Sequence, residues 1–279
     1  MTIHKNIPLV GKHHKPIVTD FMYDDLKKEL PILIFCHGYK GFKDWGPWHI
    51  MLKKFAENGF FVVAFNFSHN GGTIEQPIDF PDLEAFGNDN FSIQQDDLQS
   101  VIDEVTDPKF KFSNHINPEK IILAGHSRGG GQVILKAAHE PKITQLVTLA
   151  AINTYETAMP NGDKLEQWKK DGVMYAINGR TQQKMPHYYQ LFEDYQKNKE
   201  ALNIEKAAKK LTIPHLIVHG TNDEAVEFER GKALHQWSKN SELFSLNTNH
   251  VFGGSHPWEK NQMPDDLETI TNKVLQFLD

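Results

Sequence analysis

The sequence lacks the features of several protein classes. A single cysteine, Cys36, excludes an internal disulfide and any cysteine-based metal cluster. No stretch of 18 apolar residues and no signal-peptide core occurs, so we expect no membrane span and a cytoplasmic location. The formal net charge of -6 and the absence of a long basic run argue against a nucleic-acid partner. The composition is that of an ordinary globular protein, and 279 residues can bury a large core.

The segment Gly125-His126-Ser127-Arg128-Gly129 is the most informative motif. It matches G-x-S-x-G, in which a serine occupies a sharp turn between a strand and a helix. An apolar run at 120–124 precedes it and predicts a buried strand. The consecutive glycines that follow are poor helix formers, so we expect a steric reason for them in a tight turn. Ser127 is therefore the candidate nucleophile.

Apolar runs and amphipathic helices alternate along the chain. Two short strands are predicted at 2–10 and 15–23 as an edge hairpin. Buried strands follow at 31–36 and 60–67, with further strands on either side of the motif and near the C-terminus. This order predicts an α/β fold with a mostly parallel sheet covered by helices on both faces. Residues 1–152 and 212–279 form the predicted core, and 153–211 form a helical lid insert.

Cys36 ends the first buried strand and is followed by His37-Gly38-Tyr39. A thiol inside an apolar strand is typical of a packed side chain, so we do not assign Cys36 as a nucleophile. The loop that begins here reaches the carboxyl edge of the sheet, where ligands bind in open α/β folds. We expect the backbone N–H groups of Tyr39 and Arg128 to form an oxyanion hole.

A serine nucleophile needs a histidine base and a carboxylate that orients the histidine. In this type of fold the chain order is serine, acid, histidine. Asp223 follows the strand at 214–220 and is the candidate acid, although it could instead cap the next helix. His250 and His256 both lie in the loop after the last strand. We favour His250 as the base because it directly follows the strand, and we assign His256 to the pocket.

Further substrate-contacting candidates are spread over the sequence. An aromatic stripe in the insert, which includes Tyr188 and Phe192, predicts either a packing face or a pocket wall for bulky acyl groups. His37 and His126 flank the expected catalytic groups and are candidates for the same pocket. Adjacent histidines at 13 and 14 lack further ligands, and we predict no metal site.

Taken together, these motifs resemble the α/β-hydrolase family, and in particular serine carboxylesterases of the dienelactone-hydrolase and cinnamoyl-esterase type. The resemblance implies hydrolysis of a small-molecule ester through an acyl-serine intermediate, without a metal or organic cofactor. Dienelactone hydrolases use a cysteine nucleophile, whereas this chain has Ser127. A serine peptidase of the same fold and a catalytically silent binding protein are the alternatives. The sequence gives no indication of the oligomeric state.

Overall fold

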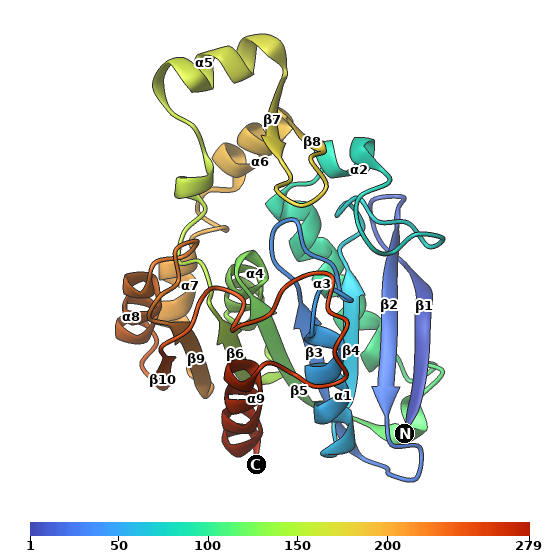
Figure 1. Ribbon diagram of the computed structural model, residues 1–279. Coiled ribbons are helices and arrows are strands. Elements are labelled where there is room, and N and C mark those ends of the chain that lie inside the picture. The colour runs from blue at the N-terminus through green and yellow to red at the C-terminus, as the bar shows by residue number, and fades with distance from the viewer.

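A mixed eight-stranded sheet forms the centre of the computed structural model, which describes all 279 residues (Figure 1). Its strands lie in the order β1 (Thr2–Val10), β2 (Pro16–Tyr23), β4 (Phe61–Asn66), β3 (Leu30–Cys36), β5 (Ile116–His126), β6 (Ile143–Leu149), β9 (His215–Gly220) and β10 (Ser241–Leu246). The first two strands form an antiparallel hairpin at one edge, and β2 also runs antiparallel to β4. The remaining neighbours are all parallel. The predicted edge hairpin and mostly parallel sheet are confirmed.

Helices cover both faces of the sheet. One face carries α1 (Trp48–Glu57) and α9 (Asp265–Leu278), and the other carries α3 (Phe91–Thr106), α4 (Arg128–Ala137), α7 (Ile204–Lys210) and α8 (Phe228–Trp237). The sheet thus separates two apolar layers, one of 39 and one of 23 buried residues. Short helical segments at α2 (Leu83–Gly87), Ser113–His115 and Glu156–Ala158 belong to the connections. None of the helices has the length and apolar character needed to cross a membrane.

The central strands are apolar on both faces because helices cover both of their sides. In β3, Ile32, Leu33, Ile34 and Phe35 have no exposed surface. Burial of each such side chain contributes roughly 1.5–3 kcal/mol relative to leaving it exposed. This stable sheet fixes the loops at its carboxyl edge, where the polar residues of the candidate site lie.

The segment between β6 and α7 stands off the end of the sheet (Figure 1). It contains α5 (Gly162–Asp171), β7 (Val173–Ile177), β8 (Lys184–Tyr188) and α6 (Gln190–Asn198). The strands pair as a separate antiparallel hairpin, so the insert, which was predicted to be mostly helical, also contains a small sheet. The prediction also placed the end of the insert at residue 211, but α7 packs on α4 and α8 within the core layer.

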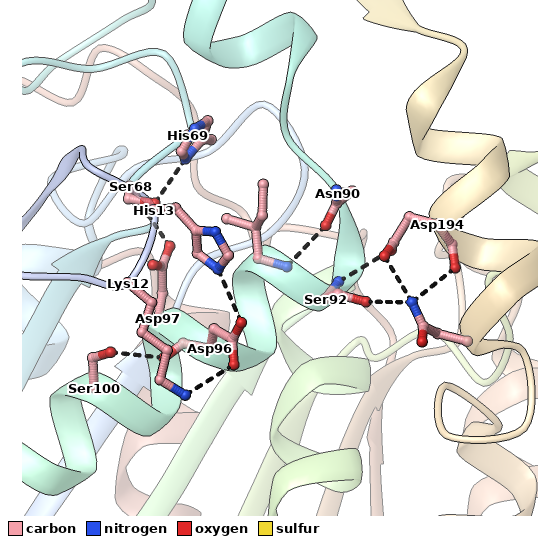
Figure 2. Close-up of polar contacts among 12 residues, drawn as sticks. Lys12, His13, Ser68, His69, Asn90, Ser92, Asp96, Asp97, Ser100 and Asp194 are labelled. Atoms are coloured by element: carbon pink, nitrogen blue, oxygen red, sulfur yellow. Dashed lines mark hydrogen bonds and ion pairs between the residues drawn. The ribbon is translucent and has the colours of Figure 1, made fainter.

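The insert is attached to the core through the first turn of α3. Ser92 donates its backbone N–H to Asp194 of α6 at 3.3 Å (Figure 2). The side-chain amide of Asn198 donates to the Ser92 hydroxyl at 3.1 Å and to the Asp194 carboxylate at 2.8 Å. Within the insert, the Trp168 indole N–H donates to the carbonyl of His187 at 2.8 Å, which joins α5 to β8. These bonds hold α6 against the core and orient the hairpin.

Candidate active site

Four parallel strands deliver the candidate residues to one edge of the sheet. His37 follows β3, Ser127 follows β5, Asp223 lies three residues beyond β9, and His250 lies four residues beyond β10. Because carboxyl ends of parallel strands meet at the same edge, side chains far apart in sequence come together there. Ser127 and His250 line the same two cavities at this edge.

Ser127 occupies a strained turn between β5 and α4. Its backbone has φ 56° and ψ -117°, a conformation that non-glycine residues rarely adopt and that costs about 1–3 kcal/mol. The flanking glycines are required by close backbone approach. A Cβ atom on Gly125 would lie 2.4 Å from the carbonyl oxygen of Gly129, and one on Gly129 would lie 2.4 Å from that of Cys36. This close backbone approach is the steric reason that we expected for the glycine run.

Asp223 is a buried carboxylate, and both of its oxygens have hydrogen-bond partners. One oxygen accepts the backbone N–H groups of Ala225 and Val226 at 2.9 and 2.8 Å. The other lies 2.7 Å from Nδ1 of His250. Burial alone would raise the pKa of Asp223, but the hydrogen bonds it accepts hold that pKa well below its ordinary value. Asp223 is therefore ionised and acts only as an acceptor.

His219 is a second histidine near this carboxylate, but its hydrogen bond is to a backbone carbonyl. Its Nε2 lies 3.5 Å from Asp223 and only 2.8 Å from the carbonyl oxygen of Val226. The N–H therefore donates to the carbonyl, and His219 supports the turn after β9. Since His250 makes the shorter contact, it is the imidazole that Asp223 orients.

His250 donates from Nδ1 to Asp223, which leaves Nε2 as the nitrogen available to Ser127. No hydrogen bond joins Ser127 to His250 in this structure, and such bonds often shorten only with substrate bound. His126 supports the backbone of His250, because its Nε2 donates to the backbone carbonyl of His250 at 2.9 Å. Burial and the neighbouring His250 lower the pKa of His126 to about 3, so it is neutral.

Two cavities meet at Ser127 and His250. The first, of about 260 Å³, is lined by aromatic and loop residues: Gly38, Tyr39, Lys40, Gly41, Trp45, Trp48, His126, Asn178 and Val251. The second, of about 410 Å³, is bounded by Tyr39, Lys40, Arg128, Ile152, Thr154, Tyr155, Thr157, Ala158, Ala225 and Val226. A small organic molecule can therefore approach the serine from two sides.

Two backbone N–H groups near Ser127 are the candidates for binding an oxyanion. Tyr39 belongs to the turn after β3, and its N–H makes no hydrogen bond within the protein. Arg128 is the first residue of α4, where an N–H has no carbonyl four residues earlier in the helix. Tyr39 and Arg128 both line the larger cavity beside Ser127. The positive end of the α4 dipole adds to the attraction for negative charge.

Four predicted pocket residues lie outside both cavities. His37 is buried, donates from Nδ1 to the carbonyl of Gly38 and accepts the N–H of Phe67, so it fixes the loops after β3 and β4. Tyr188 donates its hydroxyl to Glu84, and Phe192 packs on Trp168 inside the insert. His256 accepts the backbone N–H of Gly46 at 2.9 Å and packs edge-on against Phe42. The structure does not bring these four side chains to the cavities.

The prediction from sequence also missed cavity residues. Lys40, Tyr155 and Asn178 line the cavities, yet no motif marks them. Lys40 and Tyr155 do follow the carboxyl ends of β3 and β6, which is the signal that could have found them. Asn178 could not be found in this way, because it belongs to the turn after β7 in the insert. Cys36 is fully buried, and burial raises the pKa of its thiol strongly, which removes it as a nucleophile.

A second group of serine, histidine and aspartate lies at the end of β4 (Figure 2). The Ser68 hydroxyl lies 2.8 Å from Nδ1 of His69, and Asp97 accepts the backbone N–H of Ser68 at 2.7 Å. In this arrangement the carboxylate binds the serine and not the imidazole, so it cannot orient a histidine base. Nearby, His13 lies 2.9 Å from Asp96. The contacts of Asp96 and Asp97 join the β1–β2 turn and the loop after β4 to α3.

Comparison with known proteins identifies the family. The family model of the alpha/beta hydrolase fold matches residues 31–182, and the chain belongs to this family. Among individual proteins, it is 24% identical to the bifunctional esterase/perhydrolase DCH of Acinetobacter calcoaceticus over 93% of this chain and 96% of that protein.

Solved structures share the fold. Ferulic acid-bound Est1E from Butyrivibrio proteoclasticus is similar with a TM-score of 0.72 and 21% identity, over 98% of this chain and 97% of that one. The esterase domain of a Rhodothermus marinus protein is similar with a TM-score of 0.65 and 16% identity, over 99% and 98% of the two chains. The predicted α/β-hydrolase fold is thereby confirmed.

Proposed function

We propose that this protein is a serine carboxylesterase that acts through an acyl-serine intermediate. The observation that carries the proposal is the 2.7 Å contact between His250 and Asp223, with His250 lining the same two cavities as Ser127. The names of the relatives, an esterase/perhydrolase and an esterase, agree with this chemistry. The proposed mechanism uses side chains and backbone groups of the chain together with water.

In the proposed reaction, His250 removes the hydroxyl proton of Ser127 as the oxygen attacks the ester carbonyl. The carbonyl oxygen becomes an oxyanion and accepts the backbone N–H groups of Tyr39 and Arg128. His250 then gives the proton to the leaving alcohol, and the acyl group remains on Ser127. Water, deprotonated by His250, releases the acid and restores the serine. Asp223 stabilises the imidazolium form of His250 at both stages.

The insert acts in this proposal as a lid over the reacting groups. Asn178, in the turn that follows β7, lines the smaller cavity beside Ser127. Tyr39 Oη lies 2.8 Å from Nε2 of His187, so β8 contacts the loop that carries an oxyanion donor. A lid placed there excludes water and shapes the substrate pocket.

Labelling with a fluorophosphonate tests the nucleophile, and the Ser127→Ala variant is its matched control. We expect labelling of the native protein at Ser127, none in the variant, and loss of 4-nitrophenyl ester hydrolysis with it. A paired set of 4-nitrophenyl esters and aminoacyl anilides distinguishes an esterase from a peptidase of the same fold. Faster anilide cleavage would replace the esterase assignment, and a native protein that is not labelled would indicate a silent scaffold.

A further inference from the structure

Arg128, the residue that follows Ser127, lines the larger cavity and carries a guanidinium group. Its side chain is only 13% exposed, yet it donates no hydrogen bond within the protein. The nearest carboxylate oxygen belongs to Asp89 and lies 3.8 Å from Nη1, beyond hydrogen-bond distance. A largely buried guanidinium usually has acceptors for its five N–H groups. Here those donors are left for a group that enters the cavity.

Two aromatic rings lie next to this guanidinium. Its central carbon lies 4.3 Å from the centre of the Tyr39 ring and 5.3 Å from that of Phe91. Cation–π contacts of this kind attract the guanidinium to the rings but provide no oxygen acceptor for its N–H edge. That edge is planar and fits the two oxygens of a carboxylate. The side chain is thus fixed in place before an anion binds.

The charge around the cavities is positive. Lys40 lines both cavities, and its ammonium makes a single 3.4 Å hydrogen bond, to the carbonyl of Ile177. No aspartate or glutamate lines either cavity. Burial raises the pKa of Asp89 to about 7, although Arg128 acts in the opposite direction. Near neutral pH, Asp89 therefore offsets only part of the charge on Arg128.

Tyr155 also lines this cavity, and its hydroxyl is buried in the cavity wall. The residue is 1% exposed, and its hydroxyl has no hydrogen-bond partner in the protein. Its ring stacks on Phe91 with 3.9 Å between centres, so it and Arg128 pack against the same aromatic ring. A buried hydroxyl without a partner costs free energy that an incoming acceptor would recover.

We propose that Arg128, together with Lys40 and Tyr155, selects ester substrates that carry a second, ionised carboxylate group. The ester carbonyl lies at Ser127 while the carboxylate binds the guanidinium edge in the larger cavity. This inference rests on the proposed ester hydrolysis at Ser127 and adds a substrate class to it. Because the protein has a net charge of -6, such local positive charge stands out from the rest of the molecule.

The test compares substrates of the same length that differ only in charge. Monomethyl adipate carries the carboxylate on the acyl side, and its counterpart with a terminal amide is neutral. Acetoxyacetate and acetoxyacetamide form the corresponding pair for the alcohol side. We expect kcat/KM for at least one anionic ester to exceed that of its amide by about 10- to 100-fold, the usual range for hydrogen bonds to a charged group. The pair that shows the preference identifies the side that carries the carboxylate.

Variants connect the preference to the named side chains. Arg128→Gln keeps its backbone N–H, so we expect the anion-to-amide ratio to fall close to one. Lys40→Gln and Tyr155→Phe should each lower the ratio several-fold, and they carry the test if Arg128→Gln does not fold. Arg180→Gln is the matched control, since Arg180 pairs with Asp79 and lines neither cavity. Its ratio should equal that of the native protein.

Two outcomes separate this inference from the proposed function. A native protein that hydrolyses esters through Ser127 but prefers neither anionic ester would overturn the inference and leave the esterase proposal standing. If no ester is cleaved, the proposed function fails, and calorimetric titration of Ser127→Ala with adipate and adipamide decides the anion site. Adipate should then bind at least tenfold more tightly, and Arg128→Gln should remove the difference. Equal affinities would refute the site.

Discussion

The substitution Asp223→Asn tests how the carboxylate controls the base. Asn has one acceptor oxygen, and the backbone N–H groups of Ala225 and Val226, at 2.9 and 2.8 Å, both require it. The amide NH2 group is then directed to His250 Nδ1, where the native carboxylate accepts at 2.7 Å. Nδ1 becomes an acceptor and the ring proton moves to Nε2. Nε2 can then no longer take the proton of Ser127.

We expect kcat for a 4-nitrophenyl ester to fall by about 10³- to 10⁴-fold, equivalent to about 4–5.5 kcal/mol of lost transition-state stabilisation. KM should change little, because Asp223 lines neither cavity. The fold should persist, since the bonds from Ala225 and Val226 remain, and the melting temperature monitors this. Steady-state release of 4-nitrophenolate at pH 7.5 measures the effect.

The matched control is Asp96→Asn, a carboxylate that also contacts a histidine but lies away from the cavities. This variant should hydrolyse the ester at the native rate. An Asp223→Asn protein that is folded and retains more than about a tenth of native kcat would refute tautomer control by Asp223. Equal loss of activity in the two aspartate variants would refute it as well.

Three further predictions follow from other contacts. His250→Asn should lower kcat at least about 10³-fold. His256→Asn loses the bond from Gly46 and the packing against Phe42 but no contact with either cavity, so it should stay within a few-fold of native in the same assay; the reverse order would make His256 the base. Gly129→Ala should destabilise the fold by more than about 2 kcal/mol in urea unfolding, because its Cβ would lie 2.4 Å from the Cys36 carbonyl oxygen; native stability would contradict the close packing. Burial raises the pKa of Asp89 to about 7 in the folded state. Between about pH 4 and 7 the folded state therefore holds a proton that the unfolded state has released. The free energy of unfolding should then decline by about 1.4 kcal/mol for each pH unit of increase in this range. Asp89→Asn should remove this part of the decline between pH 5 and 7, and an unchanged slope would show that Asp89 is already ionised.

The sequence predicted the parts of the fold that depend on local pattern. Apolar runs such as that of β3 located the buried strands, and the glycines around Ser127 located the turn before α4. The candidate acid and base were chosen by chain order, and the structure places Asp223 and His250 in contact. These features are readable because strand periodicity and backbone sterics act over a few residues.

Other features depend on contacts between distant segments. The hairpin of β7 and β8 was missed because each strand has only five residues and β8 contains Pro186, which is unusual inside a strand. The aromatic stripe of the insert was compatible with either a packing face or a pocket wall. In the structure Phe192 packs against Trp168 inside the insert. Lys40 and Tyr155 reach the cavity only through loops whose paths the sequence does not define.

The most direct test of the proposed mechanism is mass spectrometry of the protein quenched during turnover of a slowly deacylated 4-nitrophenyl ester. We predict an added acyl mass on the peptide that contains Ser127, absent in Ser127→Ala and cleared by further incubation. An acyl group found on another residue, or turnover that persists in Ser127→Ala, would contradict the mechanism.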